Sequence, residues 1–286
     1  MSTINLDDLG NFDNLEDLQK ALELRMRQHN SSALPAFEGL SPEQMYELQV
    51  NFPNTEDKGP LVMNRLSEAQ LQQCPLLMQV RFIMEKMRDG KSLQLTKTGA
   101  LSTALVKEIY ALGHLKNYFI ENGLGKVYKE RDIMEINITR HLLELSSLVK
   151  KRYGKLSLTK TGEKHLDDGN FILWKLMSCL FHKFNWGYYD GYESENIGQV
   201  IPSFSLYLLK KYGDQERESG FYAEKYFLAF PQLGGTITDF RCYDTRTFMR
   251  YFKFMGFVEV TESDKLMGPS RVKKTTFLEE LLSVKI

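Results

Sequence analysis

The sequence predicts a mainly α-helical protein with small β-hairpins, which is an α+β fold. Over most of the chain, apolar residues recur three or four positions apart, as they do along one face of a helix. The strand-like runs are short and are bounded by turn residues. The pentapeptide Leu-Thr-Lys-Thr-Gly occurs twice, beginning at Leu95 and at Leu158, which indicates two local structures of one type. With 286 residues, of which 42% are hydrophobic, the chain can bury a sizeable core.

Residues 1–70 are expected to form an acidic helical arm and linker. Leucine and methionine at helical spacing predict an amphipathic helix over residues 12–26, with acidic residues first and basic residues last, as the helix macrodipole favours. After a short linker, Ser41 is expected to cap the next helix. Residues 1–60 carry eleven acidic and four basic residues, although the whole chain is neutral. This asymmetry indicates either an acidic arm beside a basic binding surface or a solvated helical face.

Residues 71–169 contain a compact series of predicted elements. These are a helix over 75–88, a strand over 92–95, helices over 101–112 and 132–146, and two strands in "SLVKK" and "KLSLT" around a turn at Tyr153-Gly154. The order helix, strand, helix, helix, strand, strand is typical of a winged helix-turn-helix, in which the last two strands form the wing. We therefore expect a winged-helix-like domain in this segment.

The repeated pentapeptide has a structural interpretation in this layout. Each copy is expected at a strand-to-helix junction, where the Leu ends a strand and a Thr hydroxyl accepts from a free amide of the next helix. Thr96 or Thr98 is the expected cap of the helix over 101–112. The Gly lets the start of the helix lie close to the sheet. Phosphate binding is the rival interpretation, but the longer glycine-rich loop and following lysine of a P-loop are absent from the sequence.

Residues 170–286 are expected to form a helical domain that ends in a second wing-like β-hairpin. Helices are predicted over 171–184, 201–211, 221–230 and 245–255, and strands in "FVEV" and "RVKKTTF". The segment "NWGYYDGYE" places four aromatic residues around two glycines. Exposed rings there could stack on nucleobases or anchor a partner. Alternatively, they form a buried corner that holds a loop onto the core.

Basic residues in the two wing-like regions indicate a nucleic-acid interface, because a wing can contact phosphates while the third helix of the motif enters the major groove. The candidate binding residues are Lys150, Lys151, Arg152 and Lys155 on the wing, Asn137 and Arg140 on the third helix, and Arg246, Arg250 and Lys253 on a later helix. The last three are spaced to share one helix face, which could equally be a solvated face. Glu130, Asp132 and Glu135 open the third helix and would repel phosphate.

The sequence contains no recognisable catalytic, cofactor or metal motif. Cys74, Cys179 and Cys242 are widely spaced, which predicts buried, reduced thiols and neither a disulfide framework nor a zinc site. No apolar run is long enough for a membrane helix, and the opening "MSTINLDDLG" has no signal-peptide pattern. We therefore expect a non-enzymatic cytoplasmic protein. The alternative is an enzyme in which Asp190, Glu193, Glu195 and Asp244, together with His182, supply acid-base groups.

Several stretches resemble a known family. "GKLSLTKTG" is similar to the wing strand of many winged-helix regulators. The segments "LSPEQMYEL", "LQLTKTGALSTALVKEI", "LSLTKTGEKHL", "FNWGYYDGY" and "YDTRTFMRYFKFMGFVEV" resemble a bacterial family of uncharacterised proteins named after an open reading frame on a root-inducing plasmid. This resemblance implies an architecture without an established activity, so no catalytic residue is transferred from it.

The function expected from the sequence is binding of double-stranded DNA through the wing and the basic helix faces. The alternative is a protein-protein interaction scaffold that uses the winged-helix fold without nucleic acid. The acidic amino-terminal residues, the zero net charge and the aromatic loop favour this alternative. The sequence assigns no oligomeric state, target sequence or partner.

Overall fold

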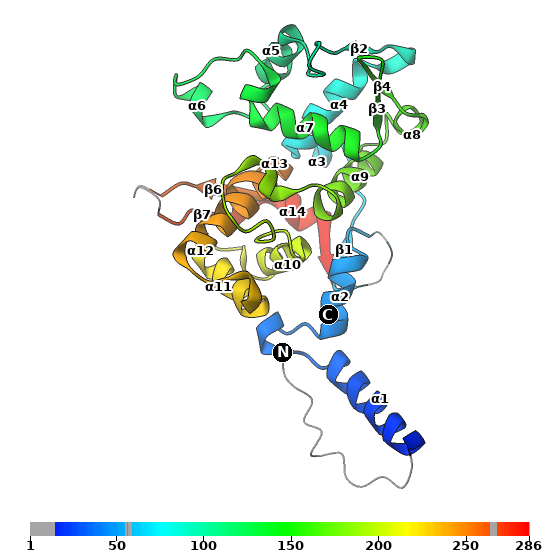
Figure 1. Cartoon of the computed structure of the whole chain (residues 1–286), viewed down its shortest axis with the longest axis vertical. Coiled ribbons are helices and arrows are strands. Elements are labelled where there is room, and N and C mark those ends of the chain that lie inside the picture. Colours follow the sequence, from blue (N-terminus) through cyan, green and yellow to red (C-terminus); the bar gives the residue numbers. More distant parts are fainter. Residues whose placement is uncertain (1–14, 55, 57–58, 264–267, 286) are drawn as a thin grey trace.

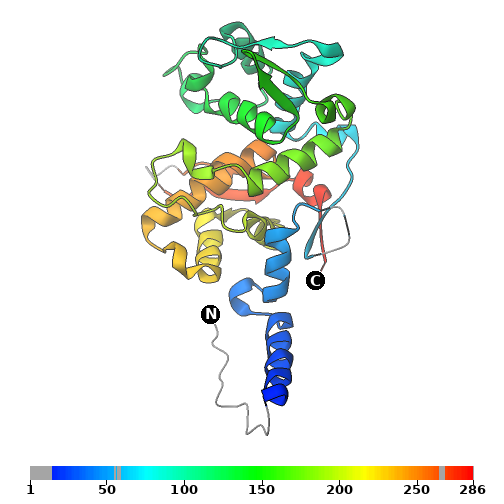
Figure 2. The same ribbon diagram turned by 45° about the vertical axis from the view of Figure 1, so that its right-hand side comes forward.

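The computed structural model describes residues 15–54, 56, 59–263 and 268–285. Figure 1 shows an elongated molecule in which one body, drawn in cyan and green, lies above a second body drawn in yellow to red, while a single helix projects at the lower end. Figure 2 shows the same stacking after a turn of 45°. The described residues form many helices and three small antiparallel sheets of two or three strands. The predicted α+β class is therefore confirmed.

The amino-terminal segment contributes the projecting helix and then joins the lower body. Helix α1 (Leu15–Ser31) has no buried residue, and the start of the helix expected over 12–26 lies outside the described residues. A 3-10 turn, η2 (Pro35–Phe37), leads to α2 (Pro42–Val50), which Ser41 caps as predicted. Strand β1 (Leu61–Met63) pairs with β8 (Leu282–Val284) near the other end of the chain. Of the described part of residues 1–70, only α1 extends away from the lower body (Figure 1).

The upper body, which we call the first unit, follows the element order expected for residues 71–169. Its elements are α3 (Glu68–Leu71), α4 (Pro75–Glu85), η3 (Arg88–Gly90), β2 (Leu93–Gln94), α5 (Thr103–Ala111), α6 (Tyr118–Glu121), η4 (Glu130–Asp132), α7 (Met134–Leu145), β3 (Val149–Arg152), β4 (Lys155–Leu158) and α8 (Lys160–Lys164). The sheet order is β2-β4-β3, so the strand before α5 pairs with the last strand of the hairpin. Helix α6 was not predicted.

The lower body, the second unit, repeats this arrangement. Its elements are α10 (Pro202–Tyr212), β5 (Arg217–Glu218), α11 (Ser219–Ala229), η6 (Pro231–Leu233), α12 (Ile237–Asp244), the π-helical stretch η7 (Thr245–Phe252), α13 (Lys253–Met255), β6 (Val258–Thr261), β7 (Arg271–Lys274) and α14 (Thr276–Leu281). The sheet order β5-β7-β6 matches β2-β4-β3 of the first unit. The sequence indicated the second half of this repeat, whereas the two-residue strand β5 is too short to give a periodic signal.

Helix α9 (Gly169–His182) connects the two units and packs against both α4 and α7. The 3-10 turn η5 (Trp186–Tyr189) follows it. A single contiguous hydrophobic cluster extends from Leu40 through both units to Leu282. Because the two units share one core, their relative orientation is fixed by packing.

The two copies of the pentapeptide occur at the ends of the neighbouring strands β2 and β4, but they form different structures. After β4, Thr159 accepts from the Gly162 amide and caps α8, as predicted. A Cβ on Gly162 would lie 2.0 Å from the Leu148 carbonyl oxygen, so this close approach requires glycine. After β2, the Thr96 amide and hydroxyl instead bond across a turn to Ala100. The expected cap at Thr96 or Thr98 is wrong, because the Ser102 hydroxyl accepts from the first turn of α5.

Candidate nucleic-acid interface

The β3–β4 hairpin presents the cations predicted on the first wing. Lys150, Lys151, Arg152 and Lys155 are all exposed. The connection is the two-residue turn Tyr153-Gly154, with φ angles of 51° and 70°. Positive φ at both central residues is the type I′ turn, whose twist matches that of paired strands. The Tyr153 side chain at the apex is 100% exposed.

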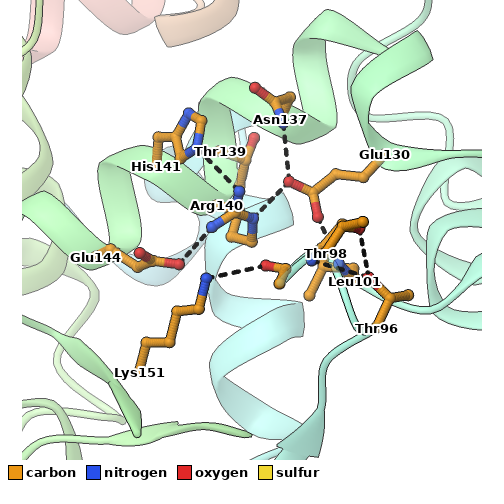
Figure 3. Close-up of polar contacts among 12 residues, drawn as sticks. Thr96, Thr98, Leu101, Glu130, Asn137, Thr139, Arg140, His141, Glu144 and Lys151 are labelled. Carbon is orange, nitrogen blue, oxygen red and sulfur yellow. Dashed lines mark hydrogen bonds and ion pairs between the residues drawn. The ribbon is translucent and has the colours of Figure 1, made fainter. Parts of the chain in front are cut away.

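The basic surface continues from the hairpin onto its neighbours. The Lys151 ammonium donates to the Gly99 carbonyl oxygen at 3.3 Å, which ties the hairpin to the first pentapeptide turn (Figure 3). Lys160 and Lys164, which follow in the second copy, are exposed on α8. We call Lys160 and Lys164, together with the four hairpin cations, the basic hairpin surface. Its members come from one short stretch of chain held by paired strands.

Two residues of the third helix that were predicted to contact nucleic acid instead contact other residues of the protein. Arg140 is buried and forms ion pairs with Glu130 and Glu144 (Figure 3). The Asn137 side chain donates to the Glu130 carboxylate at 2.9 Å and accepts from the Tyr189 hydroxyl at 2.7 Å. The prediction for Asn137 and Arg140 is therefore corrected, because both bind partners inside the protein.

The same contacts remove the expected repulsion from Glu130 and Glu135, whereas Asp132, the third acid of that set, is exposed beside Arg131. The Glu130 side chain has no solvent exposure, and its carboxylate accepts from the Arg140 guanidinium and from the Leu101 amide. Glu135 is also buried and accepts from the Asn117 amide group. Burial raises the pKa of Glu135 above its usual value, although the hydrogen bond from Asn117 lowers it in part. Neither carboxylate presents charge to the surface.

Two of the three later basic residues also face inward. Arg246 donates to Asp190 through Nε and Nη2, each at 2.8 Å, and to the carbonyl oxygens of Ser194 and Ile197 through Nη1. Arg250 adds a second guanidinium 3.2 Å from Asp190. The expected shared, accessible face is therefore wrong for Arg246 and Arg250, which lie on η7 and neutralise a buried carboxylate.

Lys253, the third member of that set, is exposed at the start of α13. It does not extend the basic hairpin surface. Figure 1 shows β3, β4 and α8 on the right of the first unit, whereas α13, which carries Lys253, lies below that unit and nearer the middle of the view. The single continuous basic face that the sequence suggested is not formed.

Helix α7 is covered by neighbouring elements along most of its length, and only its last residue, Leu145, is exposed. Every residue from 133 to 143 is buried or half-buried. It packs against α4, α5 and α9, and Tyr189 from the loop after α9 bonds to Asn137 and to the His141 ring. Burial, followed by the charge of Arg140, lowers the pKa of His141. A helix in this position has no free face for a DNA groove.

The aromatic loop is mainly a buried corner, which was one of the two interpretations of "NWGYYDGYE". The Trp186 side chain is fully buried and its indole donates to the Leu180 carbonyl oxygen at 2.8 Å. The Tyr251 hydroxyl donates to the Trp186 carbonyl oxygen. Tyr188 differs, because its side chain is exposed and packs edge-on against Tyr189. The loop therefore holds the two units together and leaves one ring at the surface.

Three acid-base groups of the enzyme alternative have structural partners, whereas Glu193 and Glu195 are exposed. Asp190 pairs with two arginines, and Asp244 accepts from the amide and hydroxyl of Ser270. The His182 ring bonds to the Phe52 carbonyl oxygen. Within the described part of the chain, no group of three His, Cys, Asp or Glu residues is placed to hold a metal ion. The three cysteines are buried and unbridged, as predicted.

Sequence reasoning missed one set of exposed aromatic and apolar side chains. They belong to the connection between α5 and α7 and are Tyr118, Phe119, Leu124 and Tyr128. The stretch "KNYFIENGLGKVYKE" gave a signal, because it combines rings, lysines and glycines without a sustained helical period. Because of its glycines, this stretch was predicted to be only a connection between two helices.

The comparisons with known proteins add a family match but no activity. Residues 72–170 match the family model of the Y4jL N-terminal domain, which corresponds to the first unit and the start of α9. The match includes both copies of the pentapeptide. No curated protein and no solved structure matches the chain significantly. No helix among the described residues is long and apolar enough to cross a membrane.

Proposed function

We propose that the chain is a non-enzymatic cytoplasmic protein that binds the phosphate backbone of double-stranded DNA through the basic hairpin surface. The observation that carries this proposal is the exposure of Lys150, Lys151, Arg152 and Lys155 around the fully exposed Tyr153. In this proposal both units are winged helix-turn-helix units, and the β3–β4 hairpin is the first wing. The shared element order and the matching strand orders β2-β4-β3 and β5-β7-β6 support this.

The proposed binding is independent of base sequence. Contacts to phosphate position a protein on a duplex, whereas contacts to base edges confer sequence preference. The third helix of the first unit, α7, is enclosed by the protein and offers no base-reading face. Backbone contacts from lysine and arginine account for most sequence-independent affinity, and that affinity falls steeply with salt.

Fluorescence anisotropy with labelled duplex DNA of mixed sequence tests the proposal. The test variant replaces Lys151, Arg152 and Lys155 with Glu. A charge-matched control replaces Lys107, Lys183 and Lys273, which are exposed elsewhere, with Glu. We expect the test variant to lose binding and the control to retain affinity close to wild type. Equal losses in both would show that overall charge, and not this surface, determines binding.

A protein-protein interaction scaffold is the second candidate, and one specific observation favours it. The helix that a DNA-binding unit would insert into a groove packs here against α9 and Tyr189, which belong to the connection between the two units. Fold alone does not dictate function. Wild-type protein that fails to bind duplex DNA at low salt would favour this second candidate over the first.

A further inference from the structure

The connection between α5 and α7 is much longer than the helix-turn-helix layout requires. That layout joins its two helices by a turn of about 3–4 residues. Here the connection extends from α5, which ends at Ala111, to α7, which begins at Met134, and it contains its own helix, α6. The extra residues form an insertion between the two helices that the helix-turn-helix layout does not explain.

This connection presents large rings and a leucine to solvent. The exposed fractions are 59% for Tyr118, 61% for Phe119, 73% for Leu124 and 55% for Tyr128. The rings of Tyr118 and Phe119 lie edge to face, with centroids 5.7 Å apart. We call Tyr118, Phe119, Leu124 and Tyr128 the aromatic platform.

Hydrogen bonds to neighbouring residues hold the aromatic platform in place. The Asn117 side-chain oxygen accepts from the amides of Phe119 and Ile120 and so caps α6, while its amide group donates to the buried Glu135 carboxylate at 3.0 Å. The Tyr110 hydroxyl donates to Glu121 at 2.7 Å. The Leu124 amide donates to the Phe119 carbonyl oxygen at 2.8 Å. The rings therefore start from an ordered arrangement, which reduces the entropy lost when a ligand binds.

The charges beside the platform favour an anionic ligand. Lys126 and Lys129 are exposed, and the Lys129 ammonium lies 5.5 Å from the centroid of the Tyr128 ring. The one exposed acid of α6, Glu121, is paired with Lys116 at 3.0 Å. Glu130 and Glu135, which are near in sequence, are buried, and the exposed Asp132 between them is paired with Arg131 at 3.5 Å. Aromatic rings with adjacent lysines are the combination that binds unpaired bases and their phosphates.

We propose that the aromatic platform binds single-stranded nucleic acid by stacking unpaired bases on its rings. In a duplex the base faces are stacked on one another and hidden, so only a single strand offers them. This inference rests on the proposed function and extends it. The basic hairpin surface binds duplex, the platform binds an adjoining single strand, and Figure 1 shows α6 and the β3–β4 hairpin at opposite ends of α7. The preferred ligand is then a duplex with a single-stranded extension.

Anisotropy with three DNA probes tests this inference: poly-dT, a blunt duplex, and the same duplex with a poly-dT tail. The test variant is Tyr118→Ala with Phe119→Ala, and the matched control is Tyr46→Ala with Tyr188→Ala, two other exposed rings. We expect the test variant to bind poly-dT roughly tenfold or more weakly, since removing one stacking ring costs about that factor. Its duplex affinity and the affinities of the control are expected to match wild type. Tyr118→Phe keeps the ring and should retain binding.

The possible results separate this inference from the proposed function. The hairpin variant with Glu at 151, 152 and 155 is expected to lose duplex binding but to keep poly-dT binding. The expectation for poly-dT stays the same if the wild-type protein fails to bind duplex DNA. Unchanged poly-dT affinity in the variant lacking both rings would overturn the inference. So would a wild-type dimer that this variant dissociates, because the platform would then be a contact between two copies of the chain.

Discussion

Arg246 and Asp190 form a two-point ion pair that is shielded from solvent. Both hydrogen bonds measure 2.8 Å, and the side chains are 0% and 6% exposed, respectively. Arg246 lies on η7, whereas Asp190 lies in the loop after α9. The pair therefore fixes the aromatic loop, and with it the connection between the units, onto the second unit. Burial alone would raise the pKa of Asp190, but hydrogen bonds and charge from Arg246 and Arg250 outweigh it and lower this pKa.

Breaking this pair should destabilise the protein strongly. Arg246→Met leaves the Asp190 carboxylate with a weaker partner in a buried position, and such losses cost about 3–5 kcal/mol. Urea unfolding monitored by circular dichroism measures the change in the free energy of unfolding. Lys253→Met, an exposed substitution beside η7, is the control and should change stability by no more than about 0.5 kcal/mol. Equal effects of the two substitutions would show that the buried pair does not hold the units.

Glu135 predicts a pH-dependent stability effect. Because its pKa is raised in the folded protein, the folded chain holds this proton more tightly than the unfolded chain does. Its contribution to stability is fully present below the unfolded pKa, about 4.3, and is lost as the pH rises through the folded pKa. Glu135→Gln mimics the protonated form and should be more stable than wild type at pH 7.

The control for this prediction is an exposed acid with the opposite shift. The hydrogen bond from Tyr110, with one from Lys116, lowers the pKa of Glu121, so Glu121→Gln should not stabilise the protein at pH 7. The advantage of Glu135→Gln should shrink as the pH falls toward 4. An advantage that stays constant between pH 7 and pH 4 would rule out ionisation of Glu135 as its cause.

Gly162 should not tolerate a side chain. A Cβ there would lie 2.0 Å from the Leu148 carbonyl oxygen, so Gly162→Ala must displace the backbone where α8 meets β3. Overpacking of this kind costs about 1–3 kcal/mol. Gly220→Ala is the matched control, because nothing lies within 4 Å of its Cβ and it lies in α11. That change should be neutral or stabilising by up to about 1 kcal/mol, and thermal unfolding of both variants checks the contrast.

The spacing of apolar residues and the turn residues in the sequence were sufficient to predict most of the architecture. Apolar spacing predicted α4, α7, α9, α10 and α11 to within a few residues, and the turn at Tyr153-Gly154 predicted the β3–β4 hairpin. The pairing of β1 with β8 could not be predicted, because it joins two three-residue strands, Leu61–Met63 and Leu282–Val284, that lie far apart in the sequence. Helix α6 was missed because a helix of four residues has no measurable period.

Only part of the candidate site could be predicted in the same way. The hairpin cations were found because they flank the turn predicted at Tyr153-Gly154, and the residues beside such a turn are exposed on both sides of the hairpin. The burial of Arg140, Arg246 and Arg250 was not foreseen, since a basic residue in a sequence gives no sign of whether a distant carboxylate will neutralise it. Asp190 and Arg246 are 56 positions apart, and their contact exists only after the two units have packed.

The salt dependence of duplex binding tests the central claim most directly. If Lys151, Arg152 and Lys155 each neutralise one phosphate, wild-type affinity should fall about 40-fold between about 50 and 200 mM salt. Any residual binding by the variant with Glu at these three positions should show a slope of log affinity against log salt that is shallower by about 3. A wild-type protein that binds duplex with the same slope as this variant would contradict the assignment of the β3–β4 hairpin as the phosphate contact.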